Sequence, residues 1–181
     1  MPFPLLTQRL TIEPLALSDL ATFVSYRQSP EIARYQGWDT NYSLTQATEL
    51  IESQIGVVMP APGEWLQLAI RNRFTGELIG DLALHALEDD DCAFEIGFSI
   101  SLPHQRQGLA KEAAASLVSY LFTEIKAKKI IAQTDRRNAP SIALLQSLGF
   151  QMDPSKRLTE EFKGEEVTVD YYSQTSLPKL T

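Results

Sequence analysis

Between residues 94 and 125 the pattern of apolar side chains changes from that of a strand to that of a helix, with a tight loop between them. Residues 94–100 (FEIGFSI) alternate and carry β-branched and aromatic side chains, whereas apolar residues recur every three or four positions from Ala110 to Ile125. The first N–H groups of a helix lack partners within it, and the helix dipole adds partial positive charge there. Gly108, at the mouth of the helix, lets backbone approach an oxygen closely. The segment therefore predicts a loop that binds a phosphorylated ligand.

The rest of the chain alternates between strand-like and helix-like patterns, which predicts a mixed α/β sheet flanked by helices. The first strand ends near a proline, so we expect it at a sheet edge. Three alternating runs separated by turns predict a central antiparallel meander. In chain order we expect a strand at 10–15, helices at 19–27 and 43–55, strands at 65–70, 77–85 and 92–100, a helix at 110–125, a strand at 130–132, a helix at 138–148, and a hairpin of strands 157–162 and 167–173.

Composition and charge exclude several classes of protein. The 181 residues are 44% hydrophobic and 22% charged, which is typical of a globular chain, and we expect one domain over residues 1–181. A net charge of −7 disfavours nonspecific binding to nucleic acid. Cys92 is the only cysteine, so a disulfide within the chain is impossible and a reducing compartment is expected. Without a signal-peptide pattern or an apolar run of about 20 residues, we expect a cytoplasmic protein with no membrane partner. Symmetric dimers are common among soluble proteins, so a monomer or homodimer is expected as a general prior.

A second motif, residues 138–150 (NAPSIALLQSLGF), follows the loop about thirty positions later. Together the two motifs resemble the GNAT superfamily of acyl-CoA-dependent N-acyltransferases. Residues 105–110 (QRQGLA) match that family's Q/R-x-x-G-x-G/A loop, and residues 138–150 match its N-x-x-S-x-x-L-L-x-x-L-G-F segment. The opening TQRL, PL and Asp19, and the closing DYYS at 170–173, resemble the RimJ/RimL-type subfamily, whose best-known members acetylate ribosomal-protein N-termini.

The resemblance implies a GNAT fold with a mixed, mostly antiparallel central sheet of about seven strands flanked by helices. Two parallel strands, one ending near Ile100 and one at 130–134, would splay apart and hold acetyl-CoA, the co-substrate, between them. The implied cofactor-binding residues are Phe98, Ser99, Ile100, Gln105, Arg106, Gln107, Gly108, Leu109, Ala110, Asn138 and Ser141. Two simpler interpretations compete with these roles: residues 105–107 are only a polar loop, and Asn138 is only a helix N-cap.

Attack of an amine on a thioester needs a neutral amine, a polarised carbonyl, and a proton or hydrogen bond for the leaving thiolate. Glu95 is the candidate catalytic base, because it lies on the strand that leads into the cofactor site, on the face opposite Phe94 and Ile96. An ordinary exposed strand glutamate is the alternative. A backbone N–H of residues 98–100 would meet the oxyanion.

The general acid departs from the broad family pattern. Many members carry a tyrosine seven positions after the motif asparagine, but this chain has Leu145 there, which cannot donate a proton. Ser141 supplies the available hydroxyl, as in RimJ/RimL-like relatives, and is the candidate catalytic acid. A weak donor suffices because a thiol pKa of about 8.5 makes thiolate a fair leaving group.

Other candidates are weaker. Trp38 lies where the family builds its acceptor pocket, so Trp38 and Glu95 are the predicted substrate-binding residues, although a core tryptophan is the alternative for Trp38. Cys92 has no basic neighbour that would activate it as a nucleophile. His85 and His104 lack metal-ligand spacing with each other or with Cys92, so no metal is expected.

The sequence thus predicts an N-acetyltransferase that acts by direct attack in a ternary complex. The acceptor stays open between a protein N-terminal α-amine and a small amine such as an amino acid, polyamine or aminoglycoside. A non-catalytic acyl-CoA-binding module is the alternative, against which the presence of Ser141 and Glu95 argues. An unrelated nucleotide-binding protein is disfavoured, because the loop lacks both G-x-x-x-x-G-K-[ST] and G-x-G-x-x-G.

Overall fold

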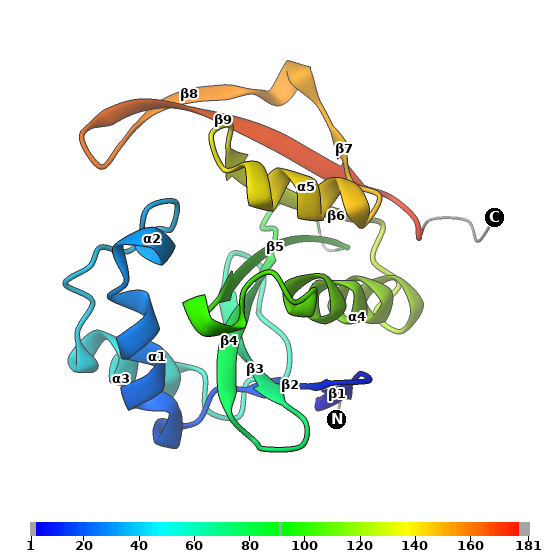
Figure 1. Ribbon diagram of the computed structural model, residues 1–181. Helices are drawn as coiled ribbons and strands as arrows, with labels where there is room; N and C mark the ends of the chain where they lie inside the picture. Colours follow the sequence, from blue (N-terminus) through cyan, green and yellow to red (C-terminus); the bar gives the residue numbers. More distant parts are fainter. Residues whose placement is uncertain (1–2, 91, 178–181) are drawn as a thin grey trace.

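The computed structural model describes residues 3–90 and 92–177, and these form a sheet in the order β1-β2-β3-β4-β5-β6-β9-β7, with β8 also paired to β9 (Figure 1). The strands are β1 (Leu5–Leu6), β2 (Leu10–Pro14), β3 (Trp65–Asn72), β4 (Leu78–Ala86), β5 (Ala93–Ile100), β6 (Lys129–Asp135), β7 (Gln151–Met152), β8 (Leu158–Phe162) and β9 (Glu165–Gln174). Among the named strands of the described residues only β5 and β6 pair with each other in parallel, apart from an isolated parallel bridge between Pro62 and Ala86. The mixed, mostly antiparallel sheet is therefore confirmed. Within the described residues the sheet has nine strands rather than the expected seven, because two of them, β1 and β7, are only two residues long.

The edge of the sheet differs from the prediction. β2 pairs with β3 along its whole length, but Thr11 and Ile12 also pair with Leu6 and Leu5 of β1. The expectation that residues 10–15 form an edge strand is wrong, because the preceding residues fold back and cover that edge. This placement carries residues 7–9, between β1 and β2, close to helix α4 (Leu109–Thr123).

The parallel pair β5 and β6 separates after three residues. Ala93, Phe94 and Glu95 pair with Lys129, Ile130 and Ile131, whereas β5 continues to Ile100 and β6 to Asp135. Each strand keeps its other neighbour, β4 or β9, over the unpaired stretch. The splayed pair is confirmed, and it leaves backbone groups between the strands free to bind a ligand.

Helices cover both faces of the sheet. Leu68 of β3 packs in a core cluster with α4 (Leu109–Thr123) and α5 (Ala139–Ser147), whereas Ala69 packs in a second cluster with α1 (Leu20–Arg27), α2 (Pro30–Ala33) and α3 (Leu44–Ser53). Successive strand residues point to opposite faces, so the two clusters lie on opposite sides of the sheet. No helix in residues 3–90 or 92–177 is long and apolar enough to cross a membrane.

The predicted helices and the hairpin are confirmed within a few residues. Ser43 caps α3 through a hydrogen bond from the Gln46 N–H, and Gly149 has the positive φ of 93° expected of a helix C-terminus. α2 was not predicted, because a proline after Ser29 indicated only the end of α1. In the structure Pro30 opens this short helix instead, where its missing N–H costs nothing. Short 3-10 helices lie at Leu17–Asp19, Leu102–His104 and Pro154–Lys156.

A buried polar cluster fixes α1 to the sheet. Asp81 of β4 is 1% exposed and accepts hydrogen bonds from the Tyr26 hydroxyl and the Gln67 side-chain amide. Arg27 Nη2 lies 3.4 Å from the same carboxylate. Burial and the neighbouring Asp81 charge raise the pKa of Tyr26, so Tyr26 remains a donor. The next helix, α2, contributes Glu31 and Ile32 to the lining of the groove described below.

Candidate active site

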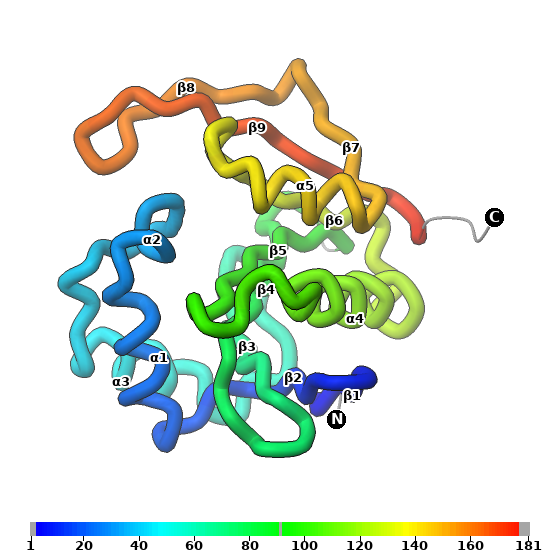
Figure 2. The backbone as a smooth tube through the Cα atoms, in the orientation of Figure 1, coloured from blue at the N-terminus to red at the C-terminus, as the bar shows by residue number. Residues whose placement is uncertain are grey.

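A groove of about 540 Å³ lies at the end of β5, where β6 has separated from it. Its walls come from residues 31–36, from residues 98–111 and from residues 138–147. Figure 2 shows the backbone turning from β5 into α4 at this point. Ten of the predicted cofactor-binding residues line it: Phe98, Ser99, Ile100, Gln105, Arg106, Gly108, Leu109, Ala110, Asn138 and Ser141.

The loop before α4 presents free backbone amides. Gly108 is the N-cap of α4 with φ 75°, a conformation that suits glycine, and it has no side chain to cap the helix. Within the described residues, no hydrogen bond is donated by the N–H groups of residues 106–111. Arg106 and Lys111 line the groove beside these amides and add positive charge. This combination of dipole, amides and cations favours a bound phosphate group.

The two glutamines of the loop act on the loop itself. Gln105 Nε2 donates to the Ile100 carbonyl at 2.9 Å, and Gln107 Nε2 donates to the Pro103 carbonyl at 3.0 Å. Gln107 does not line the groove, and its own carbonyl accepts a hydrogen bond from Arg9. The two side chains therefore brace the turn, and a ligand contact through the Gln107 side chain stays a prediction.

The second motif forms the opposite wall. Asn138 caps α5, its Oδ1 accepting a hydrogen bond from the Ser141 N–H at 3.3 Å, and both residues line the groove. The N-cap interpretation of Asn138 is thus confirmed, and its position leaves a ligand contact open. Leu145, one turn beyond Ser141, is fully buried in the core against α4. The Leu145 side chain packs in the core and carries no hydroxyl. Ser141 is therefore the hydroxyl-bearing residue of α5 that lies nearest to Asn138 in the sequence.

Glu95 lies in a row of side chains that crosses the sheet. Trp65, His85 and Glu95 are register partners on β3, β4 and β5, and Gln133 of β6 completes the row. The Trp65 and His85 rings stack with centroids 4.5 Å apart. His85 Nδ1 lies 3.6 Å from Glu95 Oε2, and Gln133 Nε2 donates to Glu95 Oε1 at 3.3 Å.

The environment of Glu95 favours a base that is easily protonated. Its side chain is 15% exposed, and burial raises the pKa of its carboxyl, although contacts with His85 and Gln133 oppose that shift. Glu95 does not line the groove. It is four residues before Ser99 on the same face of β5, about 13 Å along the strand. The sequence did not predict that His85 and Gln133 are neighbours of Glu95, because no short motif indicates the register between strands.

Trp38 does not line the groove. Its indole packs on the Arg27 guanidinium, 3.8 Å from the ring centroid, and its Nε1 donates to the Arg27 carbonyl at 3.1 Å. It also packs against the second core cluster. This geometry fits the core interpretation, and contact between Trp38 and an acceptor stays a prediction. Among residues 3–90 and 92–177, no group of three or more His, Cys, Asp or Glu side chains could hold a metal ion.

Comparison with known proteins identifies the family. The family model described as "Acetyltransferase (GNAT) domain" matches residues 9–151. The chain belongs to the GNAT acetyltransferase family. This GNAT chain is 32% identical over 152 residues to the uncharacterized N-acetyltransferase YoaA of Bacillus subtilis (strain 168), covering 83% of this chain and 85% of YoaA. It is 28% identical over 169 residues to the uncharacterized N-acetyltransferase p20 of Bacillus licheniformis, covering 93% and 94%.

Solved GNAT structures share the fold. A spermidine N-acetyltransferase from Vibrio cholerae, in complex with CoA and spermine, superposes with a TM-score of 0.79 at 21% identity, covering 93% of this chain and 96% of that one. RimL, a ribosomal L7/L12 alpha-N-protein acetyltransferase in complex with coenzyme A, gives 0.79 at 16% identity, covering 93% and 95%. The predicted GNAT fold is confirmed. The family model and the two Bacillus relatives make the protein an acyl-CoA-dependent acetyltransferase.

Proposed function

We propose that this GNAT enzyme transfers the acetyl group of acetyl-CoA to a primary amine, by direct attack while both substrates are bound. The observation that carries the proposal is the groove at the splayed strands, where unpaired amides of residues 106–111 face Asn138 and Ser141 of α5. The pyrophosphate would bind the amides at the start of α4, together with Arg106. The pantetheine arm would run between residues 98–100 and Asn138, which brings the thioester toward Ser141.

Two side chains would assist the reaction, one at the leaving thiolate and one at the attacking amine. The Ser141 hydroxyl would hydrogen-bond the thiolate as it leaves, and Glu95 would accept the proton of the attacking amine. Because Glu95 lies about 13 Å along β5 from the groove residue Ser99, the proton would travel through water rather than by direct contact. Its raised pKa suits a base that must first take up a proton and then release it.

A test of this role replaces Ser141. Ser141→Ala should lower kcat at saturating acetyl-CoA about tenfold or more, since the leaving group loses its donor. Ser53→Ala serves as the control, because the Ser53 hydroxyl only donates to the Leu50 carbonyl on α3, outside the groove lining. An unchanged kcat in Ser141→Ala would remove Ser141 from the mechanism.

The proposed acceptor is a primary amine. It is either the α-amine of a protein N-terminus or the amine of a small molecule. Structural relatives include both a spermidine acetyltransferase and an α-N-protein acetyltransferase. Their sequence identities to this chain, 21% and 16%, show a shared fold and do not decide the acceptor. The carboxylate of Glu95 on the sheet face would attract a cationic amine of either kind.

The deciding experiment follows CoA release from acetyl-CoA with a matched panel of acceptors. The panel holds short peptides with free and blocked N-termini, spermidine, single amino acids and an aminoglycoside. We expect saturable CoA release with one class and none with the blocked peptides. Tight binding of acetyl-CoA without transfer to any amine of the panel would overturn the proposed reaction.

A further inference from the structure

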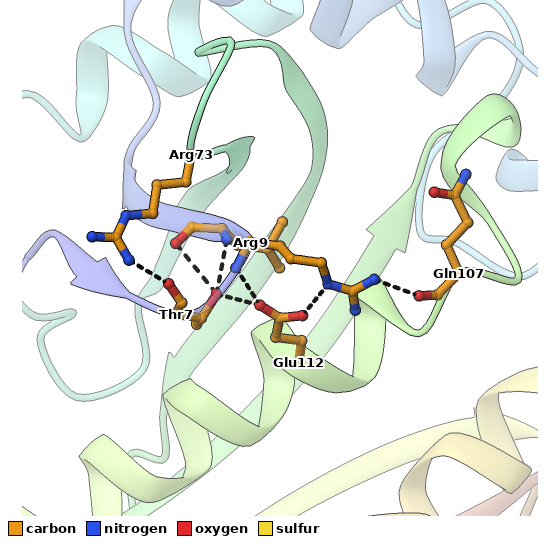
Figure 3. Close-up of polar contacts among 6 residues, drawn as sticks. Thr7, Arg9, Arg73, Gln107 and Glu112 are labelled. Carbon is orange, nitrogen blue, oxygen red and sulfur yellow. Dashed lines mark hydrogen bonds and ion pairs between the residues drawn. The ribbon is translucent and has the colours of Figure 1, made fainter.

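The segment between β1 and β2 contacts the loop that precedes α4 (Figure 3). The contact is made at Gln107, which does not line the groove, and this side of the loop is called its back. Glu112, in the first turn of α4, accepts hydrogen bonds from Thr7 Oγ1 at 2.6 Å and from Arg9 N at 2.8 Å. Arg9 Nε also donates to Glu112, at 2.6 Å. A second branch of the same guanidinium, Nη1, donates to the Gln107 carbonyl at 3.0 Å. Arg9 therefore joins the helix and the loop from behind.

The hydrogen bond to Gln107 sets the direction of the next amide. In a trans peptide the carbonyl of one residue and the N–H of the next lie in one plane and point in opposite directions. Because Arg9 holds the Gln107 carbonyl at the back of the loop, the N–H of Gly108 points away from Arg9. Gly108 lines the groove and Arg9 does not, so that N–H is turned toward the groove.

The contact with Glu112 removes a charge conflict. An acidic side chain in the first turn of α4 lies at the helix end where a pyrophosphate would bind, and like charges there would weaken binding. Thr7 and Arg9 bind both carboxylate oxygens and hold the side chain against the N-terminal segment. Burial acts to raise the pKa of Glu112, but the hydrogen bonds from Thr7 and Arg9 outweigh it and keep that pKa low, so the ion pair persists.

We infer that Arg9 is a positioning residue for the acyl-CoA donor. Paired with Glu112, Arg9 holds the loop so that the loop amides face the pyrophosphate. This inference rests on the proposed pyrophosphate site. Arg9 itself touches no ligand in it, because it lies behind the loop. The N-terminal segment thereby becomes part of the donor site, although it is separated from Gln107 by 98 positions in the sequence.

The test compares two arginines of neighbouring segments. Arg73 Nη1 donates to the Thr7 carbonyl at 2.8 Å, so Arg73 anchors the same N-terminal segment, but it contacts neither Glu112 nor the loop. Titration calorimetry of Arg9→Ala with CoA should give a Kd about tenfold above that of the unsubstituted protein, whereas Arg73→Ala should stay within twofold. Arg9→Lys, which keeps one cation but not the second branch, should fall between and provides a milder variant if Arg9→Ala folds poorly.

Pantetheine, which lacks the pyrophosphate, separates positioning from general damage. Its affinity, measured by competition with CoA, should change less than twofold in Arg9→Ala and Arg9→Lys. Equal losses for CoA and pantetheine, or a CoA affinity within twofold of the unsubstituted protein, would overturn the inference. If the unsubstituted protein bound CoA no more tightly than pantetheine, the proposed pyrophosphate site itself would fail, whatever the variants did.

Discussion

Among single residues, two glycines of the central sheet face very different surroundings. A Cβ at Gly80 of β4 would lie 2.2 Å from the Ser99 carbonyl oxygen and 3.0 Å from the Ile100 Cα, both backbone atoms at the groove. A Cβ at Gly97 of β5 would lie 3.5 Å from the Ala83 Cβ, an ordinary contact. The close approach at Gly80 lets β4 support the end of β5 that lines the groove.

Alanine at these two positions should therefore differ. Gly80→Ala should lower the free energy of unfolding by about 1–3 kcal/mol, because the added methyl group displaces backbone. Gly97→Ala should leave it unchanged or raise it by up to about 1 kcal/mol, since alanine loses less chain entropy in a strand. Urea unfolding of both variants measures the difference, and equal stabilities would contradict the packing described for Gly80.

The row around Glu95 makes a prediction about stability and pH. Burial raises the pKa of Glu95 above its ordinary value of 4.5, against the contacts with His85 and Gln133. The folded protein therefore holds this proton more tightly than the unfolded chain, so stability is lost as pH rises from 4.5 through the raised pKa. Glu95→Gln should increase the free energy of unfolding at pH 7, and the gain should shrink as pH falls through the raised pKa toward 4.5.

Denaturant unfolding at several pH values gives the test. Glu112→Gln is the matched comparison, because the pKa of Glu112 is lowered and its ion pair with Arg9 would be lost. That variant should lose stability at pH 7 instead of gaining it. A loss of stability in Glu95→Gln at pH 7 would contradict the desolvation of Glu95.

Among the elements, α5 presents one side chain with two roles to separate. Asn138 caps the helix through its Oδ1, and its Nδ2 is the group that would contact the pantetheine arm. Aspartate is as good an N-cap as asparagine but has no N–H₂ group. The pair of substitutions Asn138→Asp and Asn138→Ala therefore distinguishes the cap from the ligand contact.

Asn138→Asp should keep the thermal stability of the protein and weaken CoA binding severalfold. Asn138→Ala should weaken binding as well and also cost about 1 kcal/mol of unfolding free energy. Ser43→Ala, which removes the cap of α3 outside the groove, should lose similar stability but keep its CoA affinity. Full CoA affinity in Asn138→Asp would limit Asn138 to the capping role.

In the whole molecule, the hairpin of β8 and β9 reaches α2, one of the helices on the face of the sheet opposite α4 and α5. Figure 1 shows its turn next to α2. Lys163 in that turn donates from Nζ to the Ala33 carbonyl at 2.7 Å and to the Trp38 carbonyl, and it lies 3.3 Å from Asp39 Oδ1. One side chain thus joins segments more than 120 positions apart.

Removing this link should loosen both partners. In Lys163→Met, backbone hydrogen exchange measured by mass spectrometry should speed up in residues 158–166 and 33–39 and stay unchanged in α4. Lys126→Met is the control, because Lys126 is also an exposed lysine with positive φ but lies outside the hairpin. Unchanged exchange in the hairpin would show that its other contacts hold it in place.

The fold was largely predictable because its signals are local. Alternation gave the meander and the face of Glu95, the capping residues Ser43 and Asn138 gave two helix starts, and Gly108 gave the loop before α4. The pairing of β1 over β2 was missed, because a two-residue strand has no pattern of its own. α2 was missed because Pro30 ends one helix and begins another.

By itself, the sequence determined the family, the loop and its glycine, and the order of the longer strands and helices, because these depend on residues that are close together along the chain. The tertiary structure alone decided which distant side chains meet. It placed Arg9 behind Gln107, His85 and Gln133 around Glu95, and Trp38 on Arg27 rather than in the groove. Such contacts follow from strand register and packing between segments many positions apart, for which no short stretch of sequence carries a signal.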